Sequence, residues 1–212
     1  MTAADEQRRL RGDQALEILA VIILGLATVG TAWCGFQASR WSGEESRRAR
    51  DSSDLRIEAS RQFGLASQIV QYDTSTASDY AQALADRDAD LATFIRTSLA
   101  RDEFVPVLDR WEAEYRRGED PANLLEDQDY LDAQFAEFRA TDAESEAVAA
   151  VAEQAARNSD RYVANTVLLA MALFFAGVTG SFRNRVPRLL LLSGAGLIAA
   201  WVASQLIDLP VA

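Results

Sequence analysis

The sequence predicts an all-α protein with three transmembrane helices and a long antiparallel helical domain outside the membrane. The first observation is that Ile18–Phe36, Val163–Gly180 and Leu189–Ile207 contain no charged residue. At about 1.5 Å per residue, a helix of this length covers the hydrocarbon layer of roughly 30 Å. The second observation is that apolar residues between the first two segments recur every three to four positions, with few glycines and prolines, as in amphipathic helices.

These patterns divide the chain into seven segments. They are a cytoplasmic tail over 1–15, a first transmembrane helix over 16–40, a helical extracytoplasmic domain over 41–161, a second transmembrane helix over 162–181, a short basic cytoplasmic turn over 182–188, a third transmembrane helix over 189–207 and a tail over 208–212.

The composition excludes several classes of chemistry. All 21 basic residues are arginine, and the chain has no histidine, so it has no Ser-His-Asp or Cys-His nucleophile system and no HExxH zinc site. With Cys34 as the only cysteine, no intrachain disulfide can form. Carboxylate pairs are plentiful, but nothing marks one pair as general acid and base. We therefore expect no enzyme activity, no catalytic residue and no cofactor.

Small residues recur every four positions in the first transmembrane segment, at Ala27, Thr31, Gly35 and Ser39. This spacing places them on one stripe of a helix, where small side chains allow another helix to approach closely. We expect the stripe to serve helix packing.

The segment 41–85 has the pattern of an amphipathic helix. Leu55, Ala59, Phe63, Ala66 and Val70 are separated by three or four residues, with polar and charged residues between them. We expect one helix that continues from the first transmembrane segment. The polar run over 73–78 leaves open a break in that helix.

Two further helices are expected before the second transmembrane segment. Asp88 is a good N-cap followed by an acidic first turn, and Pro106 should kink or restart the helix that begins there. Gly118 and Pro121 mark a loop over 116–123. The last helix begins near 126–130, and because no breaker follows, we expect it to run unbroken into the membrane.

Arginines predict the orientation. Arg183, Arg185 and Arg188 lie in the shortest loop, which should therefore be cytoplasmic, with the N-terminus on the same side and residues 41–161 on the other. The arginines that follow the first span, from Arg40 to Arg50, argue the opposite. We give them less weight because long domains cross the membrane largely regardless of charge.

Aromatic and amide side chains mark one end of the three spans. One membrane face should carry Trp33, Trp41, Tyr162 and Trp201. The side-chain amides of Gln37, Asn165 and Gln205 lie at a similar depth, one on each span, so they can bond one another and hold the helices in register. We call this candidate site the membrane-exit junction. Its residues are Trp33, Cys34, Gln37, Arg40, Trp41, Asn165 and Gln205.

The domain over 41–161 is strongly acidic, with 27 acidic residues against 14 arginines and a net charge of −13. This charge excludes nonspecific nucleic-acid binding. Residues 86–90 begin like a calcium loop, but Leu91 and Thr97 stand where such a loop needs glycine and glutamate, so we expect no metal site. Cations would be attracted most easily by a group of acidic residues around the loop. These are Glu119, Asp120, Glu126, Asp127 and Asp129.

Several short segments resemble a family of uncharacterised bacterial inner-membrane proteins. They are AWCG over 32–35 with Gln37, Arg40 and Trp41, then DEFVP over 102–106 with Trp111, then SDRYV over 159–163 and LFFAG over 173–177. The similarity covers most of the chain in order, and the proline-rich loop of that family is here reduced to Pro121. The resemblance implies three spans and a helical insert, and it implies no biochemical function.

We therefore expect a multi-pass protein of the inner (plasma) membrane, with the lipid bilayer as its first partner. Its seams are poor in leucine and rich in alanine, so a lone monomer would bury little, and we expect a homo-oligomer with coiled-coil character. The leading hypothesis is a scaffold, sensor or accessory subunit whose acidic helices bind an extracytoplasmic protein. The alternative is a homo-oligomeric cation channel with an acidic vestibule. The spans favour the first hypothesis because they carry no charge and no clearly polar face.

Overall fold

The computed structural model describes residues 3–119, 126–182 and 184–212, and these residues form helices and connecting turns without any strand. The helices are α1 (Ala3–Ala85), α2 (Ala89–Phe94), the π-helix η1 (Ile95–Leu99), α3 (Val105–Arg116), α4 (Gln128–Gln134), α5 (Ala136–Val178), the 3-10 helix η3 (Thr179–Ser181) and α6 (Arg185–Asp208). The predicted all-α class is confirmed. Three of the helices, α1, α5 and α6, are long and apolar enough to cross a membrane.

Helix α1 is continuous, as predicted for the segment that follows the first apolar run. It contains no proline, and the polar run over 73–78 does not break it. The hydroxyls of Thr74 and Thr76 donate to the carbonyls of Val70 and Tyr72, at 2.7 and 3.0 Å, and so bond within the helix. A polar run of this kind therefore fits inside a helix.

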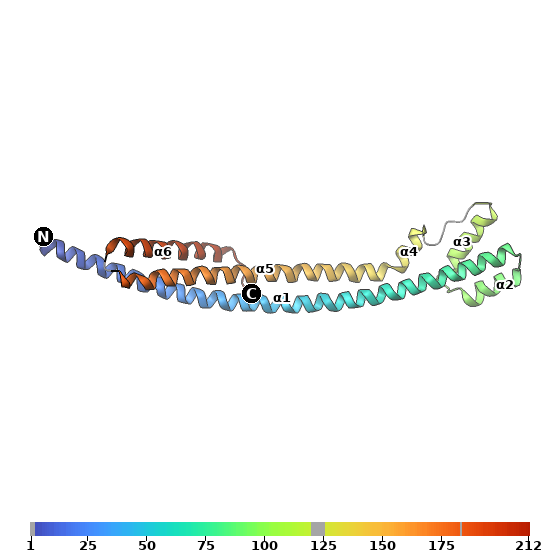
Figure 1. Cartoon of the computed structure of the whole chain (residues 1–212). Helices are drawn as coiled ribbons and strands as arrows, with labels where there is room; N and C mark the ends of the chain where they lie inside the picture. The colour runs from blue at the N-terminus through green and yellow to red at the C-terminus, as the bar shows by residue number, and fades with distance from the viewer. Residues whose placement is uncertain (1–2, 120–125, 183) are drawn as a thin grey trace. The chain divides into compact units, whose positions relative to one another are not determined.

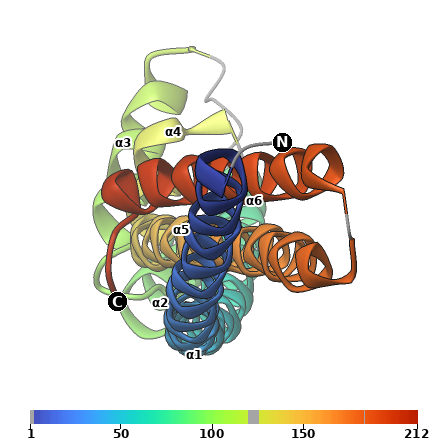
Figure 2. The same cartoon turned by 90° about the vertical axis from the view of Figure 1, so that its left-hand side faces the viewer.

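The chain divides into two units that are described separately. Unit 1 comprises residues 1–50 and 149–212, and unit 2 comprises residues 51–148. In unit 1, α1, α5 and α6 pack around common apolar clusters (Figures 1 and 2). One cluster joins Ile23 of α1, Ala172 and Ala176 of α5, and Leu192 and Ala195 of α6. Small side chains dominate this core, as is common where helices approach closely.

The predicted small-residue stripe contributes only in part to this packing. Ala27 is buried, whereas Gly35 and Ser39 are exposed. Among the glycines of this span, Gly30 is the one packed closely against α5, because an added Cβ there would lie 3.0 Å from Cδ1 of Leu169, whereas Gly25 and Gly35 have no neighbour within 4 Å. Within the single chain, the second half of the stripe takes no part in the packing, because the buried face of α1 runs through Ala27, Cys34 and Ala38.

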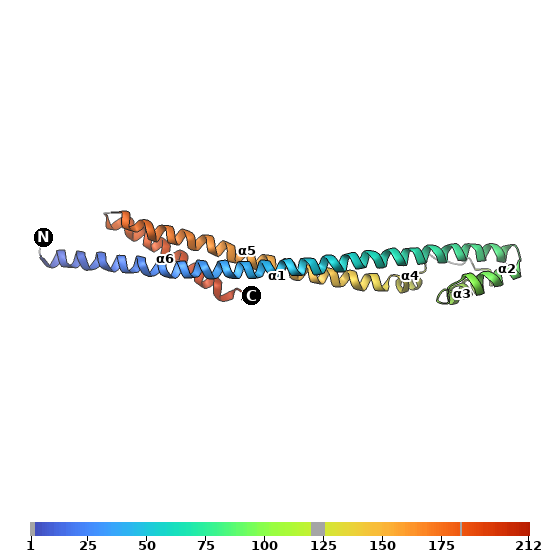
Figure 3. The ribbon, with the colours of Figure 1, turned by 90° about the horizontal axis from the view of Figure 1, so that it is seen from below.

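Unit 2 has its own core, formed where α2, η1 and α3 lie beside the end of α1 (Figure 3). The buried positions of α1 follow one helical face through Ala66, Val70, Asp73, Ala77 and Tyr80. Of the predicted seam, Ala59, Ala66 and Val70 are buried, while Phe63 remains half exposed against Phe135 and Phe138.

The predicted helix boundaries at Asp88 and Pro106 are confirmed. Asp88 caps α2 by accepting a hydrogen bond from the backbone nitrogen of Leu91 at 2.9 Å. Pro106 stands in the first turn of α3, so the chain restarts as a new helix after the break that follows η1. Proline is well tolerated there because the first turn needs no amide donor.

The prediction of one unbroken helix into the second apolar run is wrong at Phe135. This residue leaves the helical conformation, with φ −99° and ψ 7°, and separates α4 from α5. No glycine or proline marks the break. Tertiary contacts accompany it instead, because the Phe135 ring packs on Phe63 while Tyr130 on α4 reaches the carboxylate of Asp73. Beyond Phe135, α5 continues without interruption to Val178.

The two predicted turns lie partly outside the described residues. Gly118 has φ +75°, which glycine adopts without strain, but the rest of the loop over 120–125 is not described. In the basic turn, Arg183 lies outside the described residues, while Asn184 precedes α6 and Arg185 begins it. Side chains at the N-terminus are described from Gln14 onward.

Candidate functional site

Gln37 on α1 lies at the centre of the membrane-exit junction. Its side chain is buried, and its Oε1 accepts a hydrogen bond from the backbone nitrogen of Ala212 at 3.0 Å. A buried amide needs such a partner, because an unbonded polar group costs stability away from water. The partner comes from residues 209–212, which we call the C-terminal strap.

The carbonyl of Pro210 in the C-terminal strap accepts two side-chain hydrogen bonds. One comes from Nε1 of Trp41 on α1, at 3.1 Å, and the other from the hydroxyl of Tyr162 on α5, at 3.2 Å. Close by in the sequence, Ser159 Oγ on α5 donates to the carbonyl of Ala38 on α1 at 3.0 Å. The junction is therefore a place where α1, α5 and the end of the chain are joined by polar contacts.

The remaining junction residues have separate environments. Cys34 is fully buried in the apolar cluster that contains Tyr162, while Trp33 is exposed. Asn165 is buried and its Nδ2 has no hydrogen-bond partner among the residues that the structure describes, and Gln205 is exposed. The expectation that the three amides bond one another is wrong at Gln37 Oε1 and at Asn165 Nδ2.

The aromatic belt also differs from the expectation at one position. Tyr162 was expected beside Trp33 and Trp201 at a membrane face, but it is buried with its hydroxyl on the strap. Trp33 and Trp201 are exposed, as residues of such a belt would be.

Arg40 and Trp41 line a hollow of about 250 Å³ together with Glu44, Arg47 and Ala212. Glu44 accepts hydrogen bonds from Arg47 and Arg48, and these bonds hold the pKa of its carboxyl below the usual value. Arg40 makes no ion pair with any residue that the structure describes.

The acidic residues around the loop are mostly paired with arginines or exposed. Glu119 accepts two hydrogen bonds from Arg117, at 3.0 and 2.8 Å, which lower its pKa. Asp127 caps α4 and forms an ion pair with Arg110. Glu126 and Asp129 are exposed, and Asp120 lies outside the described residues. Across the described part of the chain, no group of three or more Cys, Asp or Glu side chains is placed to hold a metal ion.

A buried polar cluster in unit 2 was missed by the sequence reasoning. Asp73 on α1 is fully buried and accepts hydrogen bonds from Arg101 Nε at 3.0 Å, from Arg101 Nη2 at 2.6 Å and from the Tyr130 hydroxyl at 2.7 Å. The bond to Asp73 raises the pKa of Arg101, and burial followed by the bond to Asp73 raises that of Tyr130. Its signal in the sequence was the position of Asp73, in helical phase with the buried Val70, Ala77 and Tyr80.

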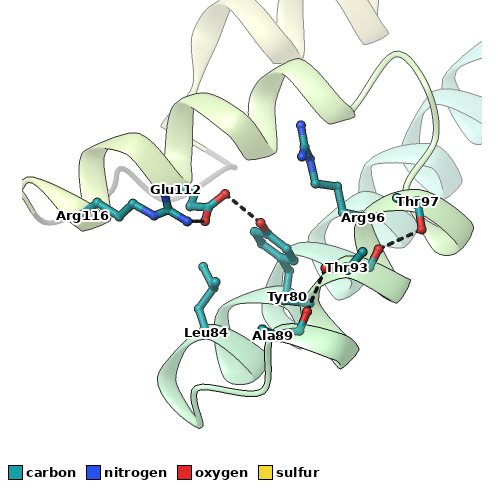
Figure 4. A pocket seen from close by; sticks show the side chains of 9 residues that line it. Tyr80, Leu84, Ala89, Thr93, Arg96, Thr97, Glu112 and Arg116 are labelled. Atoms are coloured by element: carbon teal, nitrogen blue, oxygen red, sulfur yellow. Dashed lines mark hydrogen bonds and ion pairs between the residues drawn. The ribbon is translucent and has the colours of Figure 1, made fainter.

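A second polar feature of unit 2 is a hollow of about 250 Å³ around Tyr80 (Figure 4). Tyr80 points from α1 toward α3, where its hydroxyl donates to Glu112 Oε2 at 2.8 Å and the same carboxylate pairs with Arg116. Burial and this hydrogen bond raise the pKa of Tyr80 to about 12. Arg96 on η1 also lines the hollow and forms an ion pair with Asp109 at 2.6 Å.

Both arrangements support the fold of unit 2 through paired polar groups. Each polar group of the Asp73 cluster and of the Tyr80 contact already bonds a charged or polar neighbour, so its proton is held in place.

No protein-family model matches the chain, and neither does any curated protein or solved structure.

Proposed function

We propose that the chain is an integral membrane protein that acts as a scaffold, sensor or accessory subunit. In this proposal it crosses the inner membrane three times, holds residues 41–161 outside the cytoplasm, and works as a homo-oligomer. Its acidic helices bind a further protein on that side.

The exposed side chains of the three apolar helices carry the proposal. Val29 on α1 is 70% exposed, Phe174 on α5 is 64% exposed and Leu197 on α6 is 72% exposed. Exposing large apolar side chains along three helices is unfavourable in water, and a lipid bilayer provides an apolar medium that would cover them. The apolar runs are also long enough to span that bilayer.

The antiparallel arrangement proposed for unit 2 is supported by contacts between α1 and α5. Ser52 Oγ donates to the carbonyl of Ser145 at 3.0 Å, and Gln62 Nε2 donates to Glu137 at 3.2 Å. Moving forward along α1 therefore corresponds to moving backward along α5.

Exposed apolar residues in unit 2 support an oligomer. Ile57 on α1 is 68% exposed, and Leu65 and Tyr72 are also exposed two and four turns further along. A second copy of the chain that covers this face would remove these side chains from water.

Two measurements on purified full-length protein test the proposal. Analytical ultracentrifugation in detergent should show a stable oligomer, and planar bilayers containing the protein should remain nonconducting. A monomer would contradict the oligomeric part of the proposal. Cation-selective conductance would replace the scaffold with the channel hypothesis.

A further inference from the structure

The end of α6 carries a hollow of about 340 Å³ in unit 1. It includes Gln205 of the membrane-exit junction and is distinct from the hollow that Arg40 and Trp41 line. Its lining residues are Arg161, Trp201, Ser204, Gln205, Asp208 and Leu209.

Opposite charges line this hollow without being neutralised. Among the residues that the structure describes, neither Arg161 nor Asp208 forms an ion pair, and both side chains are exposed. One turn earlier on α5, Arg157 pairs with Glu153 at 2.6 Å. Arg161 and Asp208 are therefore available to a ligand that carries both a negative and a positive group.

A strip of exposed apolar side chains leads along α6 to the hollow. Leu190, Leu197 and Trp201 are exposed at 70%, 72% and 61%, and their spacing of seven and four residues keeps them on one face. Gln205 and Asp208 continue the same face beyond Trp201. The surface thus changes from apolar to polar within about one turn, as at the boundary between acyl chains and headgroups.

We propose that this hollow binds the headgroup of a phospholipid that carries a phosphate and a primary ammonium group. Arg161 donates to the phosphate, Asp208 accepts from the ammonium, and the acyl chains lie along Leu197 and Leu190. The Gln205 amide is exposed and donates to the phosphate or ester oxygens, whereas the Ser204 hydroxyl already donates to the Trp201 carbonyl at 2.7 Å. The inference rests on the proposed insertion in a membrane.

The chemistry of the two charged residues selects this headgroup. A guanidinium binds phosphate through paired N–H donors, and a carboxylate accepts hydrogen bonds from an ammonium. A trimethylammonium headgroup has no N–H to donate to Asp208. An anionic headgroup without an amine would place a negative charge near that carboxylate.

Native mass spectrometry of full-length protein released from mixed nanodiscs tests the proposal. The discs contain phosphatidylethanolamine and phosphatidylcholine in equal amounts, and the bound lipids are counted. The ethanolamine lipid should be retained in about tenfold excess, the factor expected for one charge-assisted hydrogen bond. Asp208→Asn should abolish the preference while phospholipid remains bound. Arg161→Gln should reduce the retention of both lipids.

Arg157→Gln is the matched control, because it removes the same charge one turn away, where Arg157 is already paired with Glu153. It should leave retention unchanged. Equal retention of the two lipids by the unaltered protein would overturn the proposal, as would an equal loss with Arg157→Gln. Displacement of the lipid by soluble phosphoethanolamine at equal concentration would overturn the lipid as ligand.

Flotation with liposomes separates this inference from the proposed function. Protein that floats and resists carbonate extraction is inserted, so a missing lipid preference then contradicts only the headgroup site. Protein that does not float contradicts membrane insertion itself.

Discussion

At the scale of single residues, the buried Asp73 carboxylate links three segments of unit 2. The carboxylate joins α1 to Arg101, which follows η1, and to Tyr130 on α4. Removing one partner of a buried ion pair costs far more than the pair contributes, because the other charge is left unbonded. The cluster therefore fixes where α4 lies against α1.

We predict that Asp73→Ala lowers the free energy of unfolding of unit 2 by about 3 kcal/mol. The loss comes from leaving Arg101 and the Tyr130 hydroxyl without their acceptor. Hydrogen exchange should accelerate in residues 95–119 and 126–135, and thermal unfolding in detergent should shift downward. Asp79→Asn, at an exposed position of the same helix, is the control. Equal effects of the two changes would show that the buried cluster is unimportant.

Tyr80 and Tyr130 make unit 2 sensitive to alkaline pH. Both have pKa values raised above the ordinary value near 10, with Tyr80 at about 12, so the folded state keeps protons that the unfolded state loses. Their stabilisation is complete below pH 10 and falls as pH rises toward 12. The slope should approach about 1.4 kcal/mol per pH unit for each tyrosine.

Tyr80→Phe should flatten this pH dependence between pH 10 and 12, as measured by unfolding followed with circular dichroism. Tyr115→Phe is the matched change at an exposed tyrosine and should leave the curve unaltered. An unchanged slope with Tyr80→Phe would contradict the assigned role of its hydroxyl.

At the scale of elements, the end of α1 shows how local geometry stops a long helix. The backbone nitrogen of Asp88 bonds to the carbonyl of Ala83 at 3.0 Å, and that of Arg87 bonds to Leu84 at 3.2 Å. This is the Schellman pattern, in which the residue after the helix adopts a left-handed conformation. Glycine usually occupies that position, but here Arg87 does, with φ +57°.

Arg87→Gly should therefore stabilise unit 2 by about 1 kcal/mol, because glycine adopts a positive φ without a steric cost. Arg87→Ala keeps the strain and should give no gain. Thermal unfolding of both variants measures the difference. If Arg87→Gly and Arg87→Ala stabilised unit 2 equally, the gain would come from removing the Arg87 charge and not from relieving backbone strain.

The sequence predicted helices better than it predicted their contacts. Asp88, Pro106 and the apolar periodicity are local signals, and each marked its element correctly. The break at Phe135 and the Asp73 cluster depend on residues far apart in the chain, and no breaker or motif announces them. The polar run over 73–78 is a local signal that misled, because it left open a break in the helix, yet its threonines bond within α1.

In the candidate site, too, the sequence predicted the residues better than their contacts. Gln37 and Trp41 were both among the seven residues predicted for the membrane-exit junction, and the structure brings both to residues 209–212. The strap itself was not predicted, because a short polar and apolar tail carries no pattern that reveals its partners. The three amides were expected to bond one another from their similar depth alone, and depth does not determine the direction of a side chain.

At the scale of the whole molecule, the exposed Ile57 face is expected to bury against a second copy. Ile57→Glu should weaken self-association by at least about tenfold, because a buried contact becomes an unpaired charge. Sedimentation in detergent measures the dissociation constant. Ala143→Glu adds the same charge at an exposed position of α5 and should leave association intact. Dissociation by both variants would indicate general repulsion between acidic domains.

In the proposed topology, three spans place unit 2 and the 182–188 turn on opposite sides of the membrane. Cysteine accessibility in a Cys34→Ala background tests it most directly, with Ser53→Cys in unit 2 and Asn184→Cys in the turn, both at exposed positions. A membrane-impermeant maleimide should label Ser53→Cys in spheroplasts, and should label Asn184→Cys only after the membrane is disrupted. Labelling of Asn184→Cys but not Ser53→Cys in spheroplasts would reverse the orientation, and labelling of both would contradict the three-span account.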